Sequence, residues 1–257
     1  MPKFTVPVLL AGVLAIAGCA GSPLDEILPT RGPGTPPEYD AVVDGDITIP
    51  AVDPVYLSEP NRRATVSYSG GEAPGTIVVD PHAKFLYFVE GGGQATRYPI
   101  AVGREGRGFS GSATINRKEN WPGWAPTANM LRTEPEVYGP FAGGIPGGVA
   151  SPLGARALYL YRGGADTRYR IHGTNDLSSI GNAGTAGCIR LFNQDIIHLS
   201  QRTPMGTRVV VRSYEESVIA EGVERANRGS QLPAKIVDPN TVYDAVAAEE
   251  ARKAALE

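Results

Sequence analysis

Short runs of strand-forming residues, separated by glycine, proline and aspartate turns, dominate the middle of this chain. Residues 76–79 (T-I-V-V) and 84–90 (K-F-L-Y-F-V-E) flank a turn that contains Asp80-Pro81, which predicts a β-hairpin. The glycines at 91–93 form the next turn, and residues 96–102 predict a third strand. This pattern is typical of a mostly β domain.

Helices are expected to be few and short. Residues 193–201 predict one, with Asn193 as its N-cap, and on it Asp195 is spaced to pair with His198 at the surface. Further strands are predicted at 114–117, at 168–171 directly before His172, and at 206–211. His82 falls in the first hairpin turn, where a solvated turn residue is the expectation.

One histidine, His172, precedes one cysteine, Cys188, across a segment rich in small and polar residues. A thiolate is a strong nucleophile, and a neighbouring imidazole can lower the pKa of a thiol and carry protons. The turn ending at Gly187 offers the amides of Gly187 and Cys188 to a developing oxyanion. The pair therefore favours cysteine acyl transfer. Packing of the thiol as a small buried hydrophobe is the alternative.

Arg190 adds a fixed positive charge two residues after the cysteine. It would favour a thiolate or hold a substrate carboxylate. One downstream cysteine and three scattered histidines give no zinc-ligand spacing, so neither a metal nor a cofactor is predicted. The tryptophans Trp121 and Trp124 flank Pro122-Gly123, which suits peptide or sugar contact, with core packing as the alternative.

The H-G-T-N motif that begins at His172, together with T-A-G-C-I-R-L around Cys188, resembles the L,D-transpeptidase catalytic domain (YkuD type). One departure is Ala186, where the family often has His or Ser. The resemblance covers residues 76–212. It implies a mixed β-sheet or sandwich with few short helices, which agrees with the strand and turn pattern.

The resemblance implies a thioester mechanism on peptidoglycan peptide stems. Cys188 would attack the carbonyl between the third residue of a tetrapeptide stem and its terminal D-alanine, which leaves. An amine of another stem, or of an envelope protein, would resolve the thioester. His172 would act as general base and acid, oriented by the Gly173 carbonyl, and Arg190 and Asn175 would position the substrate.

Two alternatives stay open from the sequence. Water could replace the amine on the same Cys-His site, which would make an L,D-carboxypeptidase or hydrolase. A non-catalytic wall-binding lipoprotein could also keep the fold, although the presence of His172 and Cys188 argues against it. Papain-like enzymes place the cysteine before the histidine, and sortases set it in a different T-x-T-C context, so neither class fits.

The N-terminal residues 1–19 predict a lipoprotein signal peptide. Residues 6–17 are apolar, too few for a membrane span, and residues 16–19 (I-A-G-C) resemble a bacterial lipobox that would lipidate Cys19. An ordinary cleaved secretory signal is the alternative. This address predicts a membrane-anchored periplasmic protein, and Ala20 in place of Asp favours the outer membrane.

The predicted address also explains the cysteine usage. With Cys19 acylated, no disulfide within the chain would involve Cys188, so reactivity is the better reason for a thiol in an oxidising compartment.

The remaining segments are predicted to flank one catalytic domain. Residues 20–75 are rich in proline and glycine and predict an extended, semi-stiff linker. Residues 213–257 predict a helical C-terminal appendage, with a capping box formed by Ser213 and Glu216. The formal net charge of −3 argues against a nucleic-acid partner, which would require a basic face.

Overall fold

The computed structural model describes residues 34–57, 59–103, 109–182 and 188–228, together with 251, 254 and 255. The predicted signal peptide with Cys19, the turn residue Gly187, and most of the helix expected at the C-terminal end lie outside the described residues. Among the helices that are described, none is long and apolar enough to cross a membrane.

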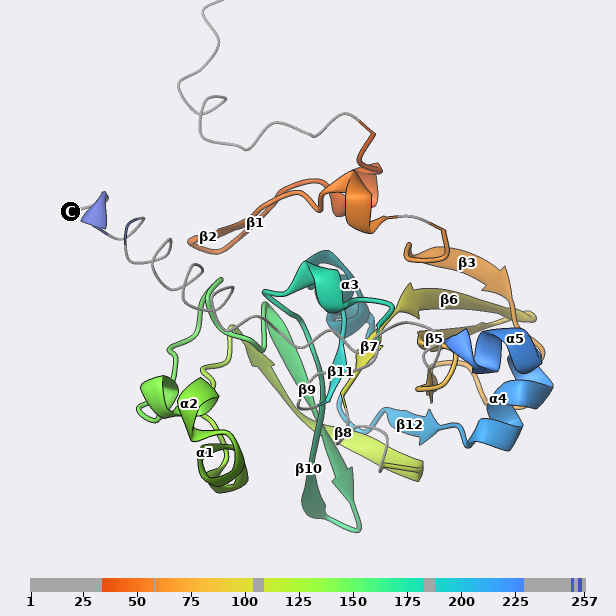
Figure 1. Ribbon diagram of the computed structural model, residues 1–257. Helices are drawn as coiled ribbons and strands as arrows, with labels where there is room; N and C mark the ends of the chain where they lie inside the picture. The colour runs from red at the N-terminus through yellow and green to blue at the C-terminus, as the bar shows by residue number, and fades with distance from the viewer. Residues whose placement is uncertain are drawn as a thin grey trace, which may run out of the picture.

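A large mixed sheet forms the body of the molecule (Figure 1). In the described residues its strand order is β3-β6-β5-β4-β12-β8-β9-β10-β11-β7, parallel at β4–β12 and β10–β11 and antiparallel elsewhere. The strands are β3 (Ala64–Ser67), β4 (Ile77–Asp80), β5 (Phe85–Gly91), β6 (Gln94–Pro99), β7 (Ala101–Val102), β8 (Gly111–Asn120), β9 (Arg156–Arg162), β10 (Ala165–His172), β11 (Ile189–Arg190) and β12 (Arg208–Val211).

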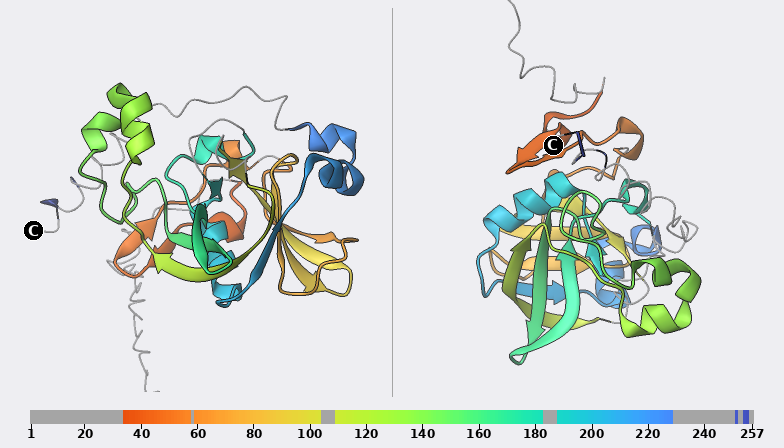
Figure 2. Two further views of the ribbon diagram at one scale, coloured as in Figure 1. Left: turned by 90° about the horizontal axis from the view of Figure 1, so that it is seen from below. Right: turned by 90° about the vertical axis from the view of Figure 1, so that its left-hand side faces the viewer.

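The helices are short and lie around the sheet (Figures 1 and 2). They are α1 (Ala128–Thr133), α2 (Pro135–Tyr138), α3 (Asn193–Arg202), α4 (Tyr214–Glu221) and α5 (Val223–Ala226), with 3-10 turns η1 (Pro37–Tyr39), η2 (Pro54–Tyr56), η4 (Gly139–Phe141) and η5 (Leu177–Ser179). The predicted mostly β architecture, with a mixed sheet and few short helices, is confirmed.

The predicted hairpin is confirmed as β4 and β5, which pair antiparallel with Ile77 opposite Phe88. The third predicted strand divides in two. β6 continues the hairpin sheet beside β5, whereas β7 leaves it and pairs with β11, with Ala101 opposite Arg190. The chain thus runs from the part of the sheet that contains the hairpin to the part that contains His172 and the strand after Cys188.

The main core lies where α3 packs on the sheet. Ile196 and Leu199 of α3 are fully buried together with Leu158 and Leu160 of β9 and with Ile171 of β10. Burial of side chains of this size contributes roughly 1.5–3 kcal/mol each, so this contact is a principal source of the stability of the central strands.

The segment 20–75, predicted as an extended linker, is folded over its described part. It forms β1 (Val42–Asp44), β2 (Ile47–Ile49) and β3. The part before β3 lies over α3, whereas β3 pairs with β6 at the edge of the large sheet (Figure 1). Tyr39, Val52 and Leu57 are buried against Phe192. Proline favours the first position of the 3-10 turns η1 and η2. The segment folds onto the domain because its apolar side chains are buried there, whereas in an extended linker they would be exposed to water.

A buried polar cluster fixes this segment to α3. Asp195 has no exposed surface, and it accepts hydrogen bonds from the Tyr39 hydroxyl at 3.1 Å and from the Arg63 guanidinium at 3.1 Å. The predicted surface pairing of Asp195 with His198 is therefore wrong. The His198 Nδ1 lies 2.7 Å from the Tyr98 hydroxyl instead.

The capping box of the C-terminal appendage is confirmed. The Ser213 side chain accepts from the Glu216 amide, and the Glu216 side chain accepts from the Ser213 amide. The helix then breaks at Gly222, whose φ of 82° suits glycine. α4 is also tied to the sheet, because the Ser217 hydroxyl donates to the buried Asp80 carboxylate at 2.8 Å.

Replacing Tyr39 with Ala should destabilise the protein by about 3–5 kcal/mol, the usual cost of truncating a buried aromatic ring. Urea unfolding followed by tryptophan fluorescence measures this free energy. Val43→Ala is the matched control, since Val43 in the same segment is 59 % exposed. An equal, small effect of both substitutions would show that the segment behaves as a linker.

Candidate active site

Two adjacent parallel strands bring the histidine and the cysteine together. β10 and β11 pair with Ile171 opposite Ile189 and with His172 opposite Arg190. Residues that lie opposite each other in neighbouring strands project to the same face of the sheet, so His172 and Arg190 point to the same side. Cys188 stands directly before β11, and its carbonyl accepts a 3.4 Å hydrogen bond from the Gly103 amide beyond β7.

A cavity of about 450 Å³ opens over this face. His172, Cys188 and Arg190 all line it, as the sequence predicts for residues that act together. Trp124 and Met130 line it from the segment that leads into α1 and from α1 itself.

Cys188 lies at the cavity in a partly exposed position. Its Sγ donates a hydrogen bond to the Arg168 carbonyl, with 3.7 Å between sulfur and oxygen. The thiol is thus accessible to a substrate and is not a packed core residue. The alternative in which it is only a small hydrophobe is not supported by this position.

His172 is buried, and its Nδ1 lies 2.6 Å from the Gly173 carbonyl oxygen. A carbonyl oxygen only accepts, so Nδ1 carries the proton and the neutral ring keeps Nε2 as a base. Burial, reinforced by the Arg190 charge, lowers the pKa of His172 to about 3, although the Gly173 hydrogen bond opposes this. The imidazole is therefore neutral at pH 7.

Close backbone packing holds the strand end that carries His172. A Cβ on Gly173 would lie 2.2 Å from the Asn193 Oδ1 and 2.9 Å from the Ala155 nitrogen. Asn193 accepts from the Ala155 amide at 2.9 Å and donates to the Thr174 carbonyl at 3.0 Å. The predicted helix starts at Asn193, but the prediction of Asn193 as the N-cap is wrong, because Phe192 holds that position. The Asn193 side chain instead bridges the residue before β9 to the residues after β10.

Arg190 is buried and fixed from behind by Asp176, with 4.0 Å between its Nη1 and the Asp176 Oδ2. Burial lowers the pKa of Arg190 from its usual value, and the Asp176 charge opposes that shift. The Ser178 hydroxyl donates to Asp176 Oδ1 at 2.7 Å, so the carboxylate is itself oriented. Sequence reasoning missed Asp176, for which an acidic residue directly after H-G-T-N was the available signal.

Asn175 is not among the residues that line the cavity. Its side-chain amide donates to the Ala150 carbonyl at 3.0 Å and thereby fixes the loop before β9. His82 and His198 do not line the cavity either. His82 packs against Tyr214 with 5.5 Å between ring centroids, and His198 sits on α3.

The two tryptophans have different surroundings. Trp124 lines the cavity and lies 6.2 Å from the Tyr138 ring of α2, centroid to centroid. The Trp121 indole packs against the core and donates to the Asp44 carboxylate at 2.8 Å. Of the two interpretations open from the sequence, a surface for substrate contact therefore suits Trp124 and core packing suits Trp121.

Three charged residues of β10 that the sequence did not single out also line the cavity: Asp166, Arg168 and Arg170. Their signal was the alternation of charged and uncharged residues in D-T-R-Y-R-I-H, which ends at His172.

Residues 74–211 match the family model described as the L,D-transpeptidase catalytic domain (YkuD). The chain belongs to this family. The resemblance seen in the His172 and Cys188 motifs is thus confirmed.

Curated relatives also match part of this L,D-transpeptidase family member. The Escherichia coli K12 protein named "Probable L,D-transpeptidase YbiS" is 33 % identical over 137 residues, 52 % of this chain and 43 % of that protein. The Salmonella typhimurium protein named "Probable L,D-transpeptidase ErfK/SrfK" is 34 % identical over 152 residues, 58 % of this chain and 48 % of that protein. The alignments span less than half the length of either relative.

A solved Brucella melitensis structure, described as that of a "Probable carnitine operon oxidoreductase caia", is 44 % identical. The match covers 61 % of this chain and 98 % of the Brucella melitensis chain, with a TM-score of 0.41. At that TM-score the structure adds nothing to the fold assignment, and the oxidoreductase description applies to that protein alone.

Replacing Gly173 with Ala should lower both stability and activity. The new Cβ would overlap the Asn193 Oδ1, and relief of that overlap must move either Asn193 or the end of β10, at a cost of about 1–3 kcal/mol. The urea midpoint and the rate of acyl transfer measure the two effects. Gly71→Ala is the matched control, because a Cβ there meets nothing within 4 Å. Equal behaviour of the two variants would contradict the close packing.

Proposed function

We propose that this protein is a peptidoglycan L,D-transpeptidase that works through a thioester on Cys188. The observation that carries the proposal is the shared cavity of Cys188, His172 and Arg190 on the paired strands β10 and β11. Family membership supports the reaction class. The substrate would be a tetrapeptide stem, from which the enzyme releases the terminal D-alanine.

The first half of the reaction follows from the neutral state of His172. Nε2 accepts the Cys188 thiol proton as the sulfur attacks the carbonyl before D-alanine. The resulting imidazolium, stabilised by the Gly173 carbonyl, then donates that proton to the leaving amine. Expulsion of D-alanine leaves an acyl thioester on Cys188.

In the second half of the reaction an amine attacks the thioester carbonyl while His172 accepts a proton from the amine. The new amide bond forms, and the thiol regains its proton. The amine of a second stem gives a cross-link, and an amine of an envelope protein gives protein attachment. In both halves the amide of Cys188, with that of Gly187, would stabilise the oxyanion.

Arg190 and Asn175 have different roles in this proposal. Arg190 lines the cavity and, buried and paired with Asp176, would position the substrate by adding a fixed positive charge beside the sulfur that also favours the thiolate. Asn175 would act indirectly, since its amide is engaged with Ala150 and fixes the loop beside the site. A hydrolase that uses the same thioester, with water in place of the amine, is the competing function.

Mass spectrometry of muropeptides incubated with the protein tests the proposal. The expected result is loss of D-alanine and a gain of the added amine, whereas a gain of water would favour the hydrolase. Cys188→Ala should abolish both, and His172→Ala should reduce the rate by about 10²–10⁴.

The other two histidines provide the controls for His172. His82→Ala and His198→Ala should retain most activity, because neither residue lines the cavity. A folded Cys188→Ala protein that still turns over substrate would refute the mechanism. Equal losses in the three histidine variants would refute the assignment of His172.

We also propose that Cys19 is lipidated and anchors the protein to a periplasmic membrane surface, with the outer membrane favoured. The apolar residues 6–17 followed by I-A-G-C support this. Metabolic labelling with a fatty-acid analogue should mark the wild type and not Cys19→Ala. An unlabelled wild type in its native host would indicate an ordinary secretory signal instead.

A further inference from the structure

The wall of the cavity carries more positive charge than the chain does overall. Among the residues that the structure describes, Arg168, Arg170 and Arg190 line it against a single carboxylate, Asp166, whereas the whole chain has a formal net charge of −3. A cavity with such a surplus attracts anionic groups, because its low-dielectric walls focus the field.

Two of these three arginines are already compensated. Arg170 is held by Asp166 through two hydrogen bonds, at 2.9 Å from Nη1 and 3.0 Å from Nη2, and it stacks on the Tyr159 ring. Arg190 is paired with Asp176 behind it. Across the described residues, no carboxylate forms an ion pair with the Arg168 guanidinium. The surplus charge of the wall therefore belongs to Arg168.

The backbone of Arg168 is fixed next to the nucleophile. Its φ of 65° is unusual for a residue with a side chain, and it occurs where the pairing register of β9 and β10 shifts. The Asp166 carboxylate accepts from the Arg168 amide at 2.7 Å and so holds this bulge. As a result the Arg168 carbonyl faces the Cys188 thiol, while its exposed side chain lines the cavity.

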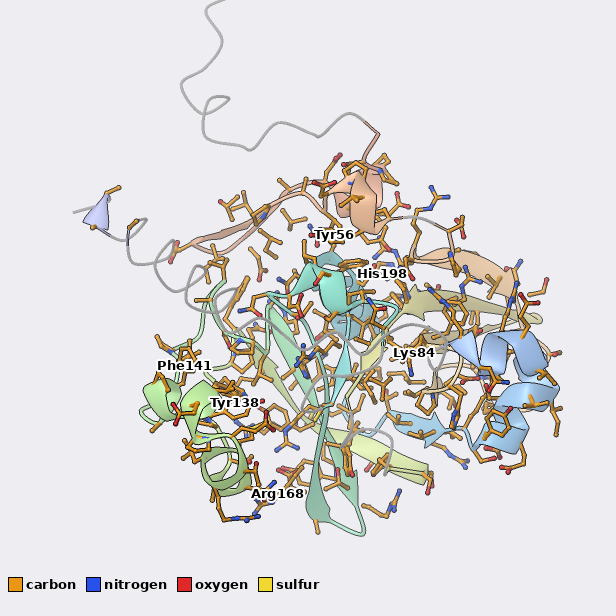
Figure 3. All side chains as sticks on the ribbon, viewed as in Figure 1. Tyr56, Lys84, Tyr138, Phe141, Arg168 and His198 are labelled. Carbon is orange, nitrogen blue, oxygen red and sulfur yellow. The ribbon has the colours of Figure 1, made fainter. Side chains whose placement is uncertain are left out.

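Other residues of the lining have a different chemistry. Trp124 and Met130 line the cavity from the segment before α1 and from α1, whereas Arg168 comes from β10, and Figure 3 labels it between β10 and α1. A peptide in this cavity thus meets apolar side chains as well as a guanidinium. This arrangement would orient a peptide that carries a carboxylate close to its reacting carbonyl.

We propose that Arg168 is a specificity-determining residue that binds a carboxylate of the donor peptide. This inference rests on the proposed function and names the chemistry of its donor, an anionic peptide. The guanidinium fork matches a carboxylate in shape as well as in charge. Two positions of a stem can supply that group: the terminal D-alanine, or an acidic side chain on the third residue.

Three synthetic donors distinguish the two sources: the free acid, its terminal carboxamide, and its third-residue side-chain carboxamide. The readout is kcat/KM for transfer to one amine acceptor. The wild type should lose about 10- to 100-fold on the carboxamide at the bound position, as expected for a hydrogen bond to a charged group. Arg168→Gln should lose a similar factor on the free acid and should no longer discriminate against that carboxamide.

Matched variants separate binding from structure. Arg168→Gln keeps the backbone amide and carbonyl that form the bulge, and Arg168→Lys should retain part of the discrimination because it keeps the charge. Arg132→Gln is the control, since Arg132 is an exposed arginine of α1 that bonds to Asn129 and does not line the cavity. It should behave as the wild type on all three donors.

Alkylation of Cys188 gives a second readout that needs no transpeptidase activity. Iodoacetate carries a carboxylate and iodoacetamide does not, so the ratio of their rates at low ionic strength reports the attraction of an anion to the sulfur. Arg168→Gln should lower this ratio and leave the iodoacetamide rate unchanged. A lowered iodoacetamide rate as well would mean that the thiol, not anion binding, was altered.

The outcomes separate the two proposals. A wild type that uses all three donors equally, or an Arg168→Gln protein that discriminates as the wild type does, would overturn the inference alone. A wild type that uses none of the donors would overturn the proposed function and the donor assignment with it. The alkylation ratio would then still decide whether Arg168 attracts an anion to Cys188.

Discussion

The parallel pairing of β10 with β11 is the constraint on which the candidate site depends. Parallel neighbours cannot be joined by a tight turn and need a crossover of roughly a dozen residues or more. The segment between His172 and Cys188 is that crossover, which explains the spacing of the two residues in the sequence. Because β11 spans only Ile189–Arg190, the register must be secured by contacts outside the ladder.

Those contacts come from the backbone beside the site and from the Asn193 side chain. The Leu191 amide donates to the His172 carbonyl at 2.9 Å, and Asn193 ties Ala155 to the Thr174 carbonyl. Gly173 allows the backbones to approach closely enough for this bridge. The glycine after His172 therefore has a steric reason in addition to the hydrogen bond that its carbonyl makes with the imidazole.

The sequence was sufficient for the parts of the fold that local pattern determines. Runs of β-branched and aromatic residues around Asp80-Pro81 predicted the β4–β5 hairpin, and Ser213 with Glu216 predicted the start of α4. Long-range partners were not predictable in the same way. Asn193 looks like a helix cap to any local rule, but it is buried and its side chain bonds to Ala155, directly before β9, and to Thr174, after β10.

The N-terminal segment shows the same limit more clearly. Its prolines and glycines are typical of a linker, and only the folded structure reveals that the Tyr39 hydroxyl donates a hydrogen bond to Asp195. At the site, the motif located His172, Cys188 and Arg190 in the cavity. Asp176 escaped notice because its partner Arg190 lies on a neighbouring strand at no fixed spacing, whereas Asp166 pairs with Arg170 four residues along its own strand, a local spacing that a strand pattern does not mark.

The charges around the sulfur are arranged by depth. Desolvation keeps His172 neutral in the interior, and Arg190 beside it is balanced by Asp176. The Arg168 side chain is exposed, so it can exchange water for a ligand at little desolvation cost. In the proposed mechanism, proton transfer belongs to the buried His172, whose neutral state is fixed by its surroundings. Recognition of a charged substrate is suited to the exposed arginine, whose partner has to come from solution.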